Sequence, residues 1–88
     1  MHADKKHVKK LLNIAKGQLE GISKMIDEDK YCIEISNQIL ASIAMLKRAN
    51  NEILEAHLNH CVVNAETLEE RKAKMEEVSS ILKKVTSY

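Results

Sequence analysis

The chain almost lacks the two residue types that interrupt helices. Among its 88 residues there is no proline, and glycine occurs only at Gly17 and Gly21. Sheets and tight turns depend on these residues to reverse the backbone, whereas helix interiors exclude them. The sequence therefore predicts an all-α protein, and its length predicts one domain over residues 1–88. The two glycines, four positions apart, would share one helix face and allow a close helix crossing.

Apolar residues recur at helical spacing in three segments, which predicts a three-helix protomer. The predicted helices cover residues 4–26, 30–63 and 67–86. Asp29 stands just before the second helix and is predicted as its N-cap, because a short carboxylate accepts hydrogen bonds from the first free backbone amides. Thr67 and Glu70 have the spacing of a capping box at the start of the third helix.

Three residues of metal-ligand type lie on one stripe of the second predicted helix. His57 and Cys61 follow Cys32 by 25 and 29 positions. At about 100° per residue, His57 and Cys61 fall roughly 20° to either side of Cys32. Along the axis, however, Cys32 and His57 are roughly 37 Å apart. Two antiparallel copies would bring Cys32 of one beside His57 and Cys61 of the other, so the spacing predicts a symmetric dimer with two shared sites.

Two thiolates and one imidazole form a soft donor set that favours Cu(I). Structural zinc sites, by contrast, use four protein ligands. His60 is a fourth candidate but points away from the other ligands, and His2 or His7 would cover the site in a nickel or cobalt sensor. Two thiols facing each other across a dimer could also form a sulfur bridge and sense oxidants or reactive sulfur. That chemistry would not need His57.

Positive charge is concentrated near the N-terminus, although the net charge of the chain is only +1. Five lysines and a single acid, Asp4, occur within residues 1–16, and two further cations lie in the middle of the second helix. Such cations either form a solvated surface or contact the phosphates of DNA. No helix-turn-helix, zinc-finger or aromatic stacking motif is recognisable. The candidate DNA-binding residues are Lys5, Lys6, Lys9, Lys10, Lys16, Lys47 and Arg48.

The sequence shows neither a secretory segment nor a long apolar run, which predicts a cytoplasmic protein without membrane contact. In a reducing compartment, two cysteines are expected as free thiols or ligands rather than as a structural disulfide. Catalytic triads, paired catalytic carboxylates and phosphate-binding loops are not recognisable either. The chain is therefore not expected to be an enzyme.

Four stretches of the chain resemble one known family. They read GQLEGI at residues 17–22, MIDEDKYC at 25–32, KRAN at 47–50 and HLNHCV at 57–62. The Tyr-Cys start of the second helix, together with His-x-x-x-Cys near its end, is the more specific part. On these residues the chain resembles the copper-sensitive operon repressor family, whose wider membership includes nickel or cobalt, formaldehyde and persulfide sensors. The similarity extends over nearly the whole chain.

This resemblance implies an assembly, a metal and a function. Family protomers have three helices, pair into dimers with an antiparallel four-helix core, and form homotetramers as dimers of dimers. Members that sense Cu(I) bind it through residues matching Cys32 of one protomer and His57 and Cys61 of the other. Tyr31 and Glu77 match residues that support these ligands. The resemblance implies that the metal-free protein binds operator DNA, represses copper-efflux genes and leaves the DNA when Cu(I) binds.

The stretch before Gly17 departs from the family pattern. Family members carry several arginines and lysines there, whereas this chain has Leu11 in place of the first arginine and Asn13 in place of another basic residue. Lys16 keeps a charge, and Arg48 still matches a DNA-contacting arginine of the family. Two alternatives therefore stay open beside a copper-responsive repressor. One is a thiol or persulfide sensor, and the other is a Cu(I)-binding member whose DNA binding is weakened or lost.

Overall fold

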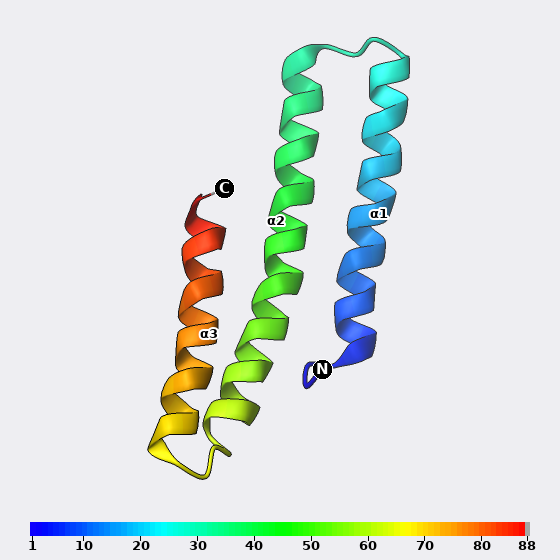
Figure 1. The fold of residues 1–88 in the computed structure, drawn as a ribbon. Coiled ribbons are helices and arrows are strands. Elements are labelled where there is room, and N and C mark those ends of the chain that lie inside the picture. The colour runs from blue at the N-terminus through cyan, green and yellow to red at the C-terminus, as the bar shows by residue number, and fades with distance from the viewer. Residues whose placement is uncertain (88) are drawn as a thin grey trace. The chain divides into compact units, whose positions relative to one another are not determined.

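The computed structural model describes the backbone of residues 1–87 and all of their side chains except those of residues 62, 86 and 87. Its elements are the α-helices α1 (Lys5–Asp27), α2 (Cys32–His57) and α3 (Leu68–Ser87), with a π-helical turn, η1 (Leu58–Val62), after α2 (Figure 1). No strand occurs in the described residues, so the prediction of an all-α, three-helix protomer is confirmed. Within the same range, no helix is both long and apolar enough to cross a bilayer.

The chain forms two compact units. One is Lys5–Asn50, which contains α1 and most of α2, and the other comprises Met1–Asp4 and the chain from Asn51 onward. In the first unit, one face of α1 is buried at helical spacing, as expected for an amphipathic helix that packs on a neighbour. The buried residues of this unit are Val8, Leu11, Ala15, Ile22, Ser42 and Ala49. The single domain over residues 1–88 stays a prediction.

The turn after α1 shows that Asp29 ends the first helix instead of starting the second. Asp29 has a φ of 51°, in the left-handed region. Its N–H donates to the carbonyl of Ile26 at 3.1 Å, and the N–H of Lys30 donates to the carbonyl of Met25 at 3.0 Å. These bonds form a Schellman motif, which satisfies the last carbonyls of a helix. The N-cap prediction for Asp29 is therefore wrong; its short polar side chain tolerates the left-handed conformation.

The end of the second helix also differs from the sequence-based expectation. The sequence predicts one α-helix up to residue 63, whereas the α-helical part ends at His57 and Leu58–Val62 form a π turn. A π turn closes i→i+5 hydrogen bonds, so it contains more residues per turn than an α-helix. Such turns are frequent at functional sites. Apolar periodicity does not reveal a π turn, because its extra residue moves the following apolar side chains around the helix by only part of a turn.

Thr67 caps α3 as predicted. Its Oγ1 accepts the N–H of Glu70 at 3.1 Å. The carboxylate of Glu70 reaches back to the N–H of Glu66, 3.1 Å from Oε2, which is one residue before the amide that a capping box would use. The start of α3 therefore follows closely from the sequence.

One side of α2 exposes large apolar side chains. Each of these residues exposes between 41% and 59% of its surface; they are Ile33, Ile39, Leu40, Ile43 and Leu46. An extended apolar surface of this kind usually marks contact with another molecule. The protomer thus has an apolar face along α2 against which a second copy could pack.

Gly17 and Gly21 have no packing role within the described residues. A Cβ atom at either position would meet nothing within 4 Å, so the close helix crossing expected from their spacing is not present there. We expect Gly17→Ala to raise the free energy of unfolding by about 0.5–1 kcal/mol, because alanine loses less backbone freedom on folding. Denaturant unfolding at fixed protein concentration measures this, with the exposed α1 substitution Ser23→Ala as control. A loss of stability would instead show that a second copy packs on the bare backbone.

Candidate metal centre and basic surface

His57, the last residue of α2, is held by a carboxylate from α3. Its Nε2 lies 3.3 Å from Oε2 of Glu77. The other carboxylate oxygen of Glu77 lies 3.9 Å from Nζ of Lys74. A carboxylate beside Nε2 favours one orientation of the imidazole ring and leaves Nδ1 as the nitrogen that can bind a metal.

An apolar cavity opens beside this pair. It has a volume of about 220 Å³ and is lined by Ile53, Leu54, His57, Glu77, Val78 and Ile81. Because most of the lining is aliphatic, the imidazole and the carboxylate meet at the edge of a weakly polar environment. The side chain of Glu77 is nevertheless 57% exposed and that of His57 is 31% exposed, so water reaches the contact as well.

Cys61 lies in the π turn, four residues after His57. Its thiol is free and half-buried. In an α-helix, a residue at i+4 lies slightly more than one turn beyond residue i. The wider π turn changes that offset, so the direction of the Cys61 side chain relative to His57 depends on η1.

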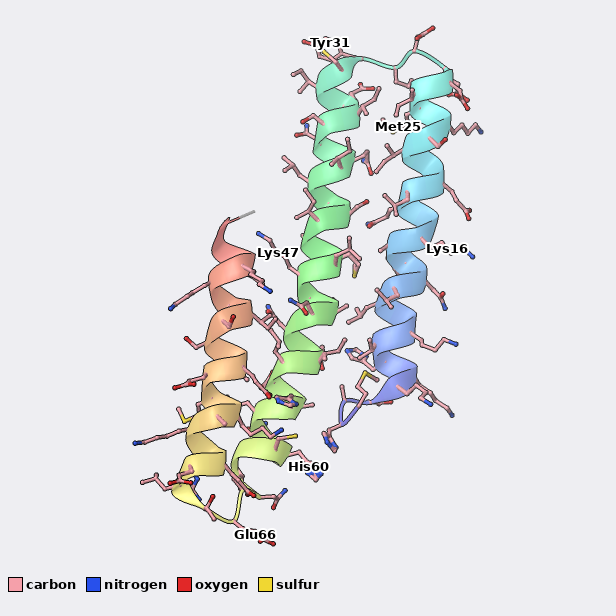
Figure 2. The ribbon with its side chains drawn as sticks, viewed as in Figure 1. Lys16, Met25, Tyr31, Lys47, His60 and Glu66 are labelled. Carbon is pink, nitrogen blue, oxygen red and sulfur yellow. The ribbon has the colours of Figure 1, made fainter. Side chains whose placement is uncertain are left out.

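Cys32 is the first residue of α2 and has an exposed free thiol. Tyr31 precedes it and is also exposed; its carbonyl accepts the N–H of Ile35 at 3.2 Å and so starts the helix (Figure 2). Cys32 belongs to the unit that contains α1, whereas His57 and Cys61 belong to the other. In the part of the chain that the structure describes, no three His, Cys, Asp or Glu side chains gather as a metal site. A site shared with a partner protomer stays a prediction.

His60 has partners of its own. Its ring meets the ring of His2 edge to face, with the centroids 3.7 Å apart and 74° between the planes. Nδ2 of Asn64 donates to the carbonyl of His60 at 2.7 Å and lies 3.1 Å from its Nδ1. Desolvation, followed by repulsion from His60, lowers the pKa of His2 below its ordinary value. The sequence pattern gives no sign of this cluster, because His2 is remote along the chain; only the Asn64 spacing at a helix end hints at a local bond.

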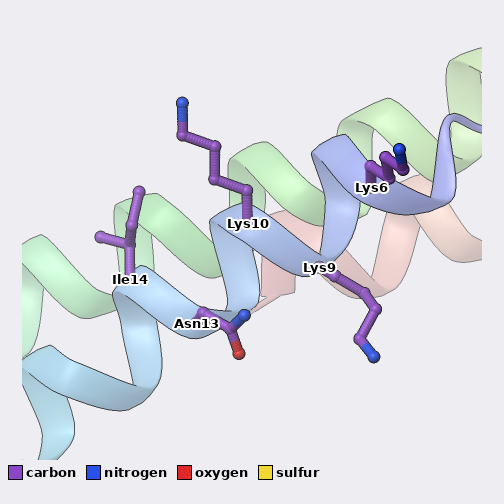
Figure 3. Close-up of a pocket in the computed structure, with 5 residues that line it drawn as sticks. All are labelled: Lys6, Lys9, Lys10, Asn13 and Ile14. Atoms are coloured by element: carbon purple, nitrogen blue, oxygen red, sulfur yellow. The ribbon is translucent and has the colours of Figure 1, made fainter.

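The lysines of α1 line a shallow hollow on the surface. A space of about 540 Å³ is bordered by Lys6, Lys9, Lys10, Asn13 and Ile14 (Figure 3). The other candidate DNA-binding residues, Lys5, Lys16, Lys47 and Arg48, are exposed but lie outside the hollow. Figure 2 shows Lys16 extending from α1 away from α2, and Lys47 extending from α2 away from α1. The structure thus brings together only part of the predicted DNA-binding set.

Leu11 is not part of this basic surface. Only 2% of it is exposed, so it belongs to the buried face of α1. Asn13, by contrast, is exposed and borders the hollow. Of the two departures from the family pattern, the one at Leu11 therefore affects the core, and the one at Asn13 changes the surface.

Comparison of the sequence with known proteins agrees with these features. The profile of the family described as "Metal-sensitive transcriptional repressor" matches residues 4–84. The copper-sensing transcriptional repressor CsoR of Bacillus subtilis (strain 168) is 32% identical over 83 residues, which cover 94% of this chain and 82% of that protein. The copper-sensing transcriptional repressor RicR of Mycobacterium tuberculosis (strain ATCC 25618 / H37Rv) is 45% identical over 56 residues. That match covers 64% of this chain and 58% of RicR.

Two solved structures share the fold. The copper-sensing repressor CsoR with Cu(I) from Geobacillus thermodenitrificans NG80-2 matches with a TM-score of 0.81 at 32% identity, over 92% of this chain and 84% of that one. The nickel-responsive transcriptional regulator InrS matches with a TM-score of 0.78 over 97% and 96% of the two chains. At 22% identity, the likeness to InrS concerns the fold alone. A profile that spans almost the whole chain describes a class of regulators and not of enzymes, and the helices superpose on a relative of that class; the chain therefore belongs to the metal-sensitive transcriptional repressors of the copper-sensitive operon repressor family.

Proposed function

We propose that this protein is a Cu(I)-responsive transcriptional repressor of the cytoplasm. The metal-free form binds operator DNA, Cu(I) releases it, and the controlled genes serve copper efflux. The observation that carries this proposal is the 3.3 Å contact between Nε2 of His57 and Glu77, which leaves Nδ1 for a metal. The free thiol of Cys61 follows four residues later. The copper-sensing relatives support the choice of metal.

The proposed ligands are Cys32 of one protomer and His57 and Cys61 of its partner. Both thiols are free, and thiolates with an imidazole form a soft set that suits Cu(I). Structural zinc would take four ligands from the protein. Glu77 supports His57 from α3, and Tyr31, next to Cys32, is proposed to support the ligands through its phenol.

The proposed assembly is an antiparallel homodimer with a four-helix core, and two dimers form a homotetramer. The exposed apolar side of α2 supports this arrangement, because residues such as Ile39 and Ile43 would lose their contact with water in a dimer. An antiparallel pairing along α2 would also place the Cys32 end of one copy beside the His57 end of the other.

The proposed mechanism is a shift between two arrangements of the assembly, of which only one fits DNA. Bound Cu(I) would supply a soft centre for two thiolates and one imidazole. Cys32 and His57 stand at opposite ends of α2, so a site that joins two copies constrains both ends of this helix. Lys47 and Arg48 lie between these ends, so a bend or shift of the helix would move both cations. A coupling of about 1–3 kcal/mol between the two sites would be typical.

An anaerobic Cu(I) titration, with and without DNA, tests the proposal. We use a duplex from the region upstream of the coding sequence and follow binding by fluorescence anisotropy. The metal-free protein should bind the duplex, and Cu(I) should lower its affinity by roughly 5- to 150-fold, the range of typical coupling energies. Tight Cu(I) binding without any binding of DNA by the metal-free protein would indicate a copper-binding member that has lost DNA recognition.

A thiol or persulfide sensor is the second candidate, because both cysteines are free and Cys32 is exposed. In that function a bridge would form between Cys32 of one protomer and Cys61 of its partner. Mass spectrometry after treatment with a persulfide donor would detect the bridge as a cross-linked dimer. His57 separates the two candidates, since sulfur chemistry does not require its imidazole.

A further inference from the structure

One face of α1 combines cations with two residues that lie outside the buried core, Asn13 and Ile14. At about 100° per residue, Lys6, Lys10 and Asn13 lie within roughly 60° of one another and opposite the buried Leu11. Ile14 flanks this row, and all of these except Leu11 border the hollow of Figure 3. The face is therefore a polar, positively charged strip with an amide and an aliphatic side chain at one end.

Neither Asn13 nor Ile14 belongs to the buried core of the protomer. Both are exposed, Ile14 at 40% of its surface. No hydrogen bond to the Asn13 amide occurs in the described part of the chain. Asparagine and β-branched isoleucine are also not among the strongest helix formers, so the helix itself does not require them. Both side chains are therefore available to a molecule that contacts this face.

We infer that this face reads DNA sequence: Asn13 and Ile14 contact an A·T base pair in the major groove, while lysines of the same face contact the flanking phosphates. This inference rests on the DNA binding proposed above and deepens it. An asparagine amide can donate one N–H to N7 of adenine while its carbonyl oxygen accepts from the N6 amino group. An aliphatic side chain can pack on the thymine methyl group of the same pair.

The charge and shape of the face favour DNA over a second copy of the chain. The hollow contains Lys6, Lys9 and Lys10, and no acidic residue borders it. Two copies meeting at this face would bring like charges together, whereas phosphates complement them. One turn beyond Asn13 the row continues to Gly17, whose bare backbone leaves room for the wall of a groove. An α-helix fits into the major groove of B-DNA.

The test selects duplexes from a random pool with the metal-free, full-length protein and sequences them. The wild type, Asn13→Ala, Ile14→Ala and Lys10→Ala are compared, and Ser23→Ala serves as a control on another part of α1. Affinities for the best wild-type duplex are then measured over a range of salt concentrations. Circular dichroism confirms that each exposed substitution leaves the helices intact.

We expect Asn13→Ala to lose the preference for A·T at one position of the selected site and about tenfold in affinity for it, with an unchanged salt dependence. Ile14→Ala should weaken the same position. Lys10→Ala should keep the selected sequence but lower affinity for all duplexes and reduce the salt slope by about one per phosphate contact. If Asn13→Ala and Ile14→Ala select the wild-type sequence with wild-type affinity, the base-reading inference is wrong although DNA binding stands. If the wild type enriches no duplex, DNA binding itself is wrong.

Discussion

Replacing His57 with alanine is expected to leave much of the Cu(I) affinity in place while abolishing the release of DNA. The two thiolates of Cys32 and Cys61 provide most of the affinity for a soft cation. His57 is the proposed ligand that has a polar contact with α3, through Glu77 at 3.3 Å. Its loss removes this link between the metal site and that helix. The ratio of DNA affinities without and with Cu(I) should fall from roughly 5- to 150-fold to about one.

His60→Ala is the matched control, because it removes an imidazole three residues away that contacts His2 and Asn64 rather than Glu77. This variant should keep the full response. Glu77→Gln tests the link from the other side: it keeps a hydrogen-bond acceptor but loses the charge, so an intermediate response is expected. A DNA-release titration in which His57→Ala behaves like the wild type would refute the assigned role.

The helices could be predicted because they depend on local properties of the sequence. Without proline and with apolar residues at helical spacing, 4–26 and 67–86 were recognisable almost to the residue as Lys5–Asp27 and Leu68–Ser87. The junctions were harder. Asp29 suits an N-cap and a left-handed helix end alike, and the backbone hydrogen bonds decide between them. The π turn at Leu58–Val62 exchanges one hydrogen-bond pattern for another without changing the residue types.

The candidate site, like the fold, could be predicted only in part. Cys32, His57 and Cys61 can be selected from the sequence by residue type and spacing alone. The contact of His57 with Glu77, expected from the resemblance, depends on how α3 packs and is present in the structure; its role in metal binding stays a prediction. Leu11 is buried, but the family comparison could not predict this. The loss of an arginine from the family pattern does not show whether the position is exposed or buried.

Two inactive variants are expected to restore copper binding when their protomers are mixed. Cys32→Ser and Cys61→Ser each remove a thiolate from every shared site. Each variant alone should lose more Cu(I) affinity than the roughly 10- to 100-fold that loss of an outer hydrogen-bond partner costs. In a mixed dimer, however, one site receives Cys32 from the Cys61→Ser protomer. The same site receives His57 and Cys61 from the Cys32→Ser protomer and is therefore complete.

The size of the recovery distinguishes a shared site from one within a protomer. Equal amounts of the two variants, unfolded and refolded together, should pair at random, so about half of the dimers are mixed and about one quarter of all sites are intact. Anaerobic competition with a Cu(I) chelator counts these tight sites, and each variant refolded alone serves as the control. No protomer in the mixture has both thiols. Cu(I) sites built within single protomers would therefore show no recovery, and such a result would exclude the antiparallel pairing on which the proposed switch depends.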